Sequence, residues 1–323
     1  MIVPRLIELV GETSFDTRAA VLSILGQVGK SQADEVGPLL LSRLIDPQEE
    51  LMVRVAAAKA LGNLGPAGVG LIVGTLRQGD AAQQLIAAQG LVEIGSAASP
   101  AKEALTELLC EPLADTELRA LAAVALGQLG SAAKDAAPHL IALLRKPETD
   151  SYLRSMCAVS LGQVDPSSAS TLEVTLDDAI PDVQIASAYS LCKLVPGHAR
   201  GLEVLLRWLE SDEYRHSAMD AMIDIGVASL PQVVAKMQDT SQSPETRNAC
   251  LQVVKTFDEP AIMPLLHALN DEVLAEEAGW ALRDRGNELL PTLMASVEEE
   301  VDFGPLARAN MRHVIEDLLT GVG

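Results

Sequence analysis

Few of the residues that could carry chemistry stand at the spacings that chemistry needs. The five histidines are scattered along the chain, and no HxH, HExxH or His/Cys cluster supplies metal-ligand spacing. His216 and His313 are each followed four residues later by an aspartate, Asp220 or Asp317, an arrangement typical of a hydrated surface pair. No GxSxG, P-loop or dinucleotide-binding motif occurs in its required context. We therefore expect no catalytic, metal or cofactor site, and a protein that is not an enzyme.

The four cysteines indicate reduced, buried thiols. No two of them stand at CxxC spacing, and Cys157, Cys192 and Cys250 each fall in the small, apolar part of a repeated helix. Free cysteines in such positions pack as small apolar side chains. We expect them to be buried, which suits a reducing, cytoplasmic location.

Composition and charge exclude several classes of protein. Apolar residues make up 48% of the 323 and aromatic residues only 2%, which favours closely packed helices with a core of Leu, Ile, Val and Ala. The 24 basic and 45 acidic side chains give a net charge of −21, which repels a nucleic-acid backbone. The N-terminal residues lack the pattern of a secretory signal, and no uncharged apolar run reaches the length of a membrane span. We expect no nucleic-acid partner and no membrane partner.

One phrase recurs along the chain and predicts its architecture. It reads RVAAAKALGNLG at 54–65 and RALAAVALGQLG at 119–130, and successive copies begin 28 to 36 residues apart, the period of a helix-pair solenoid. The first positions of the copies are Arg18, Arg54, Gln84, Arg119, Arg154, Gln184, Arg215, Arg247, Ala275 and Arg308.

Each copy has the signals of one helix, here named helix B. Its apolar residues follow a helical period, as at Ala57, Ala58, Leu61 and Leu64. Asp115 and Asp150 stand four residues before an Arg and are expected to cap the helix N-terminus. The expected left-handed glycines that end helix B are Gly29, Gly65, Gly95, Gly130, Gly226 and Gly286.

A second apolar segment, helix A of the next repeat, follows each glycine and often carries Pro in its first turn, as at Pro38 and Pro138. One A–B pair cannot bury its apolar faces alone, so the pairs must stack into one continuous core. Small residues in helix B, among them Gly62, Gly127 and Gly162, are expected to allow close helix packing. We predict one all-α, right-handed α-solenoid over 1–323, with about ten antiparallel helix pairs. Their approximate bounds are 1–30, 31–65, 66–95, 96–130, 131–165, 166–195, 196–226, 227–258, 259–286 and 287–323.

The phrase VRVAAAKALGNLG at 53–65, with its Arg, its alanines and its Leu-Gly-x-Leu-Gly ending, resembles the short HEAT-like repeats of the phycobilin-lyase (PBS lyase) type. The resemblance covers roughly residues 4–319 and implies the solenoid fold. It also implies an alternative function, a subunit of a bilin chromophore lyase or a lyase-like chaperone, although spacing assembles no pocket with a thiol or a His, Tyr and Asp cluster. In HEAT proteins the repeated Arg commonly bonds an acid nearby, which predicts pairs such as Asp115 with Arg119 and Asp16 with Arg18. The first helix begins almost at Met1 without a polar cap, as expected for a segment of a longer array.

A partner surface is predicted on the concave face that the B helices line in such a solenoid. Counting the first residue of the phrase as zero, positions +1, +2 and +5 are expected to face outward. They are mostly apolar in the second to sixth repeats, and acidic with one tryptophan toward the C-terminus. The predicted partner-binding residues are Val55, Leu85, Ile86, Leu121, Val124, Met156, Val159, Ile185, Tyr189, Asp220, Glu276, Glu277 and Trp280.

Two interpretations of these positions stay open at the level of sequence. The side chains either pack against neighbouring B helices or form an exposed ridge that binds a peptide or helix. Residues 203–323 contain 22 acidic and 9 basic side chains, a surface suited to a basic segment. We expect a non-catalytic protein-interaction scaffold or adaptor with a protein or peptide partner. A nucleic-acid-binding HEAT protein would need a basic groove, which the charge argues against.

Overall fold

The computed structural model describes residues 2–12, 14–298 and 303–320, and every regular element within those ranges is a helix. The residues group into two compact parts, unit 1 (Met1–Thr175) and unit 2 (Leu176–Gly323), which are described separately. The boundary between them falls inside the predicted repeat 166–195. The all-α solenoid fold is confirmed, and the two units are stacks of the predicted helix pairs.

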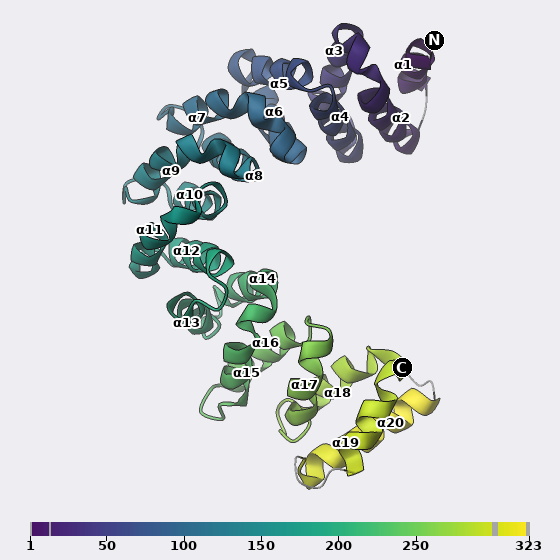
Figure 1. Ribbon diagram of the computed structural model, residues 1–323, viewed down its shortest axis with the longest axis vertical. Coiled ribbons are helices and arrows are strands. Elements are labelled where there is room, and N and C mark those ends of the chain that lie inside the picture. The colour runs from purple at the N-terminus through teal and green to yellow at the C-terminus, as the bar shows by residue number, and fades with distance from the viewer. Residues whose placement is uncertain (1, 13, 299–302, 321–323) are drawn as a thin grey trace. The chain divides into compact units, whose positions relative to one another are not determined.

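Unit 1 alternates A helices with B helices, and each B helix contacts the next B helix (Figure 1). In Figure 1 the B helices lie along the inner side of the curve of unit 1 and the A helices along its outer side. Its A helices are α1 (Ile2–Glu12), α3 (Ala33–Leu44), α5 (Pro66–Gln78), α7 (Lys102–Cys110), α9 (Ala137–Leu144) and α11 (Ala169–Val174). Its B helices are α2 (Phe15–Val28), α4 (Leu51–Asn63), α6 (Ala81–Ile94), α8 (Thr116–Gln128) and α10 (Ser151–Val164).

Unit 2 begins with a B helix and continues with the same alternation. Its B helices are α12 (Pro181–Leu194), α14 (Arg215–Ile225), α16 (Pro244–Val254), α18 (Ala275–Arg283) and α20 (Pro305–Thr320). Its A helices are α13 (Ala199–Trp208), α15 (Leu230–Gln238), α17 (Ile262–Ala268) and α19 (Leu290–Glu298). Within unit 2, α12 contacts α14, α14 contacts α16, and α18 contacts α20.

The glycines that end the phrase adopt a backbone conformation different from the predicted left-handed helical cap. Gly65, Gly95 and Gly226 have positive φ, but their ψ values of −149°, −135° and −156° place them close to a region that only glycine adopts readily. Gly29 was expected to join them, but its φ is −83°. Several B helices pass at this glycine into a 3-10 turn leading to helix A: Gly29–Gln32, Gly95–Ala101, Gly130–Ala136, Gly226–Ser229 and Gly286–Leu289.

The predicted caps and prolines are confirmed with one exception. Asp115 accepts a hydrogen bond from the backbone N–H of Glu117 at 2.8 Å, and Asp150 accepts one from Tyr152 at 2.9 Å. Pro138 stands in the first turn of α9. Pro38 was expected at a helix start, but α3 begins five residues earlier, at Ala33, so this proline lies inside the helix.

The core consists of small residues in the middle of each B helix and one large aliphatic residue a turn later. Ala122, Ala123 and Leu126 of α8 are fully buried, as predicted for the opening of the phrase. Cys157 and Cys250 occupy the place of Ala122 in their own helices and are likewise buried. This small-residue stripe lets adjacent B helices approach closely, and at Gly26 an added Cβ would lie 2.5 Å from the Cα of Ala60 on the next B helix.

Candidate binding surface

Two positions of the repeated phrase stay open to solvent in every B helix. Counted from the first residue of the phrase as zero, they are +5 and +9, one helical turn apart, and no side chain in either position is buried. We call this row the B surface of each unit. In unit 1 it comprises Ser23, Gln27, Lys59, Asn63, Gln89, Glu93, Val124, Gln128, Val159 and Gln163. In unit 2 it comprises Tyr189, Lys193, Asp220, Asp224, Gln252, Thr256, Trp280, Asp284, His313 and Asp317.

The residues predicted to form an apolar ridge on unit 1 are less exposed than expected. Ile86 is only 8% exposed and packs in the core, so its assignment to the surface was wrong. Val55, Leu85, Leu121, Val124, Met156 and Val159 are half-buried. Consecutive B helices of unit 1 pack against each other, and side chains that border such a contact are expected to be covered in part by the neighbouring helix.

Position +9 was missed by the sequence reasoning, although the sequence carried a signal for it. The residue there is polar in every copy, and in unit 1 four of the five are amides. Because +9 lies one turn beyond +5, the two positions share a helix face. The B surface of unit 1 is therefore rich in amides, with Val124 and Val159 as its two apolar members and one ion pair, Lys59 with Glu93 at 3.5 Å.

The B surface of unit 2 is acidic, as the sequence predicts. Asp220 and Glu276 are exposed, and Trp280 is 50% exposed. Ile185 is only 7% exposed, so its assignment to this surface was also wrong. Glu277 is half-buried and accepts hydrogen bonds from Gln252 Nε2 and Lys255 Nζ, both at 2.8 Å; the bond from Lys255 and then that from Gln252 lower the pKa of Glu277.

A second polar pair joins consecutive B helices at the start of unit 2. Tyr189 donates its hydroxyl to Asp224 at 2.5 Å, and Lys193 Nζ donates to the backbone carbonyl of Asp224 at 3.0 Å. Burial and then this hydrogen bond raise the pKa of Tyr189 to about 12. Tyr189 is therefore neutral and held in place at neutral pH, which makes it a link between α12 and α14 rather than a free contact residue.

Three of the repeated arginines bind the end of helix A, and Arg119 does so in place of the predicted pair with Asp115. Arg119 Nε donates to the carbonyl of Leu109 at 3.0 Å, and Arg154 and Arg247 donate to the carbonyls ten residues before them, those of Leu144 and Met237. Each of these carbonyls belongs to the last turn of helix A, where no intrahelical partner exists. The arginine thus ties helix B to helix A of its own repeat. The aspartates Asp115 and Asp150 use their carboxylates as helix caps instead.

Two arginines also reach the following repeat. Arg18 pairs with Glu49 at 2.5 Å, not with Asp16, and the buried Arg247 pairs with Asp271. Burial alone would raise the pKa of Asp271, but hydrogen bonds from Arg247 and from the backbone N–H of Val273 leave it below its ordinary value. These pairs, together with that of Arg215 and Asp212 at 2.9 Å in the preceding turn, confirm the expected bond to a nearby acid for Arg18, Arg215 and Arg247.

On the helix-A side of unit 1, a hollow of about 420 Å³ brings together reactive and charged side chains whose spacing in the sequence did not indicate a site. Its lining includes Cys110, His139, Lys102 and Asp135. Cys110 Sγ lies 3.4 Å from His139 Nδ1, and Lys102 Nζ lies 2.7 Å from Asp135. Burial raises the pKa of the Cys110 thiol, although Arg119 acts in the opposite direction. The thiol is thus exposed but protonated at neutral pH, and among the described residues no group of three or more His, Cys, Asp or Glu side chains could hold a metal ion.

The cysteines differ enough in burial for a chemical test. We expect Cys110 to react with a thiol reagent such as DTNB in the native protein, and Cys157, Cys192 and Cys250 to react only after unfolding. The latter three are buried, and burial raises the pKa of each to about 12. Absorbance of the released thionitrobenzoate would count one fast thiol, and the Cys110→Ser variant should show none. Fast reaction of two or more thiols in the native protein would contradict the packing described.

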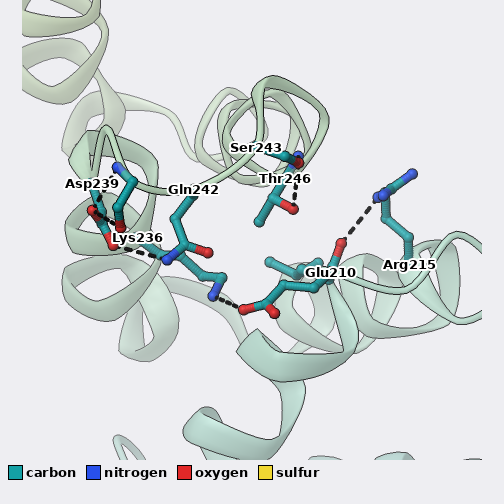
Figure 2. A network of polar contacts seen from close by, with 9 residues as sticks. Glu210, Arg215, Lys236, Asp239, Gln242, Ser243 and Thr246 are labelled. Atoms are coloured by element: carbon teal, nitrogen blue, oxygen red, sulfur yellow. Dashed lines mark hydrogen bonds and ion pairs between the residues drawn. The ribbon is translucent and has the colours of Figure 1, made fainter.

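The helix-A side of unit 2 holds a hollow of about 770 Å³ between α13 and α15. Figure 2 shows the polar network beside it: Lys236 Nζ bonds Glu210 at 2.5 Å, and Asp239 accepts from Gln242 Nε2 at 2.8 Å. The bonds from Ser241 and Gln242 lower the pKa of Asp239 to about 2. The lining cations Arg200, Arg207 and Lys236 are all engaged by neighbouring side chains. These contacts hold the A helices in place and leave no unpaired lining cation.

Comparison with known families agrees with this geometry. Residues 118–146, which include most of α8, the following turn and α9, match the family described as PBS lyase HEAT-like repeat. The protein contains HEAT-like repeats. No curated protein matches the sequence.

Several solved structures are similar to 80% or more of the chain at low sequence identity. A crystal structure of importin beta matches with a TM-score of 0.52 and 12% identity over 97% of this chain and 50% of that one. Human deoxyhypusine hydroxylase in complex with glycerol matches with a TM-score of 0.36 and 18% identity over 80% of this chain and 97% of that one. Kap121p bound to RanGTP matches with a TM-score of 0.47 and 13% identity over 98% and 45%. The chain spans about half the length of importin beta, and at this identity the likeness shows the fold alone.

One stretch of the HEAT-like array passes a test of length and composition for a membrane span. Residues 215–238 are apolar enough, with a third of the stretch buried. The stretch comprises α14 and α15, which are separated at Gly226, where φ is +85°. Such a single match is weak evidence of a membrane segment.

Proposed function

We propose that this protein is a non-catalytic scaffold or adaptor that binds protein partners along the B surfaces of its HEAT-like repeats. The observation that carries the proposal is a stripe along α18 and its C-cap. Trp280 and Asp284 of the B surface follow Glu276, at position +1, at four-residue spacing, and all three are exposed. Within the described part of the chain neither carboxylate forms an ion pair or a side-chain hydrogen bond. In a chain with 2% aromatic residues, an exposed indole between two free carboxylates is a distinctive surface feature.

The chemistry of the stripe favours a basic partner segment. An indole face attracts an Arg or Lys side chain, and flanking carboxylates add direct ion pairs. Unit 2 as a whole has 25 acidic and 11 basic residues, so a basic segment would also be steered toward it over longer range. The partner proposed for unit 2 is therefore a protein or peptide segment with exposed Arg or Lys side chains.

For unit 2, we expect Trp280→Ala to weaken binding of a fluorescein-labelled peptide of alternating Arg and Gly about fivefold, because the loss of a partly desolvated cation–π contact costs about 1 kcal/mol. Fluorescence anisotropy gives the Kd. Met263→Ala, which removes an exposed apolar side chain from helix A of the same repeat, should leave the Kd unchanged. Glu276→Gln should weaken binding more than Glu288→Gln, although the two variants have the same net charge. If Glu276→Gln and Glu288→Gln weakened binding equally, the peptide would be held only by long-range charge attraction and not by the stripe.

For unit 1, we expect Val124→Glu combined with Val159→Glu to abolish capture of a partner from cell extract. Both side chains are half-exposed members of the B surface, and a charge at each would be desolvated in any contact with a partner. The matched control is Leu113→Glu with Val174→Glu, which adds the same charge at exposed positions outside the B surface. Thermal melting of both variants checks the fold. If the B-surface variant captured the same partner as the parent, the B surface of unit 1 would not be the binding site.

The hollow beside Cys110 favours one second candidate, a role in bilin attachment or handling, because it places a thiol, an imidazole and a carboxylate together. Against it stands the raised pKa of Cys110, which keeps the thiol protonated and weakly nucleophilic. Absorbance of a free bilin mixed with the protein distinguishes the two candidates. A spectral change that Cys110→Ser removes would support the second, and an unchanged spectrum supports the scaffold.

A further inference from the structure

The B helices α4 and α6 of unit 1 leave a hollow of about 220 Å³ between them. Its floor is apolar and fully or nearly buried, formed by Leu44, Ala58 and Ile86. Leu51, which also lines it, is 65% exposed, so the apolar surface continues outward to solvent. A cavity of about 150 Å³ lined by aliphatic side chains is enough to bind benzene, whereas drug-sized ligands need about 300 Å³ or more. The hollow therefore has the size for one apolar side chain.

Arg54 lines the same hollow and differs from the three repeated arginines that are tied to the end of helix A. Arg119, Arg154 and Arg247 each donate Nε to a carbonyl at the end of helix A. Arg54 Nε is buried and has no acceptor, as is also true of Arg18 Nε. Arg18, however, pairs with Glu49, whereas within the described ranges the Arg54 side chain has no ion pair. A buried donor without an acceptor is destabilising, so this guanidinium is better satisfied when an anion binds beside it.

Two other acidic side chains near Arg54 already form ion pairs with other residues. Glu93, the acidic residue of the lining, lies 3.5 Å from Lys59. Glu49, five residues before Arg54, pairs with Arg18 and Arg43. Within the described ranges, Arg54 is therefore a cation without an ion pair next to an apolar hollow.

We propose that the hollow between α4 and α6 binds a protein segment in which a Leu- or Phe-sized side chain stands next to a carboxylate, with the side chain in the hollow and the carboxylate on Arg54. The proposal rests on the scaffold function and names the chemistry of the partner of unit 1. It is opposite in sign to the partner of unit 2, whose stripe takes a cation. A carboxylate beside an arginine forms a charge-assisted, often bidentate hydrogen bond, which the neutral amide of the same segment cannot form.

The test uses N-acetylleucine, which carries a leucine side chain directly beside a carboxylate. With the full chain labelled at alanine and glycine amides, we expect N-acetylleucine to shift the NMR signals of Ala58 and Gly90. N-acetylleucinamide, which lacks the charge, should bind about fivefold more weakly, and N-acetylglycine, which lacks the apolar side chain, should also bind more weakly. Shifts spread over the surface, equal shifts from acid and amide, or no shift at millimolar concentration would overturn the proposal.

Variants at two equivalent arginines separate binding from folding. Arg54→Gln should remove the preference for the acid over the amide while leaving the melting temperature close to that of the parent, because Arg54 has no protein partner to lose. Arg54→Lys should keep part of the preference. Arg119→Gln, at the same position of another repeat, should lower the melting temperature and leave the preference unchanged. If these outcomes fail while the variant at Val124 and Val159 still loses partner capture, the Arg54 site is wrong. The proposed scaffold function is then unaffected.

Discussion

Arg247→Gln is expected to lower the free energy of unfolding by about 3 kcal/mol, because removing one member of a buried ion pair leaves the other charge without its partner. Arg247 is 5% exposed, ties α16 to the end of α15 through the carbonyl of Met237, and pairs with Asp271. Glutamine is too short to make both bonds. Urea denaturation followed by circular dichroism measures the loss.

A surface arginine supplies the matched control. Arg77 pairs with Glu107 at 2.6 Å, but both side chains are exposed. Arg77→Gln should change the free energy of unfolding by no more than about 1 kcal/mol, since exposed ion pairs contribute little. If the two variants unfolded at the same urea concentration, the buried bonds of Arg247 would contribute no more to stability than the exposed ion pair of Arg77.

The same pair gives a pH dependence with a defined sign. The folded pKa of Asp271 is lowered, so its contribution to stability is present above the ordinary carboxyl value of 3.8 and is lost as the pH falls through the lower folded pKa. The difference between the parent and Arg247→Gln should therefore be largest near neutral pH and shrink in acid. A difference that stayed constant or grew on acidification would show that the bond from Arg247 does not lower the pKa of Asp271.

Gly26→Ala is expected to destabilise the protein by about 2 kcal/mol, although the change adds only a methyl group to a helix. An added Cβ would lie 2.5 Å from the Cα and 2.8 Å from the Cβ of Ala60, so α2 and α4 would have to separate. Alanine has the higher helix propensity, which offsets about 1 kcal/mol of this cost. Urea denaturation again gives the difference.

Gly70→Ala is the control for helix propensity alone. Gly70 lies inside α5, and no atom stands within 4 Å of the position that its Cβ would take. That variant should be more stable than the parent by up to about 1 kcal/mol. The two glycine variants must therefore move in opposite directions. A stabilising effect at Gly26 would mean that the close approach of α2 and α4 does not limit packing.

The sequence predicted the repeat and its helices because both depend on local signals. The period of the phrase, the caps at Asp115 and Asp150, and the small buried residues around Ala122 are all confirmed. Each of these features depends on residues only a few positions apart, so it can be recognised in the sequence alone. The solenoid architecture follows from such signals repeated at a constant interval.

The surface was predicted less well because it depends on how neighbouring helices rotate against each other. Ile86 and Ile185 belong to the core, and position +9 belongs to the surface, because the helix face is turned from the one assumed. The arginines were assigned the nearest acid along the chain, whereas Arg119 and Arg154 bind carbonyls ten residues back. A backbone acceptor leaves no trace in side-chain identity, so only the structure could reveal it.

The bond from Arg119 to Leu109 has a consequence for how such a chain can change in length. Both partners belong to one helix pair, and the glycines at Gly95 and Gly130 mark the ends of the stretch that contains them. The stretch from one glycine to the next therefore contains the hydrogen bond that joins its own two helices, and it has a glycine with positive φ at each end. Duplication or deletion of such a stretch would therefore change the length of the B surface without breaking the bond between helix A and helix B inside another repeat.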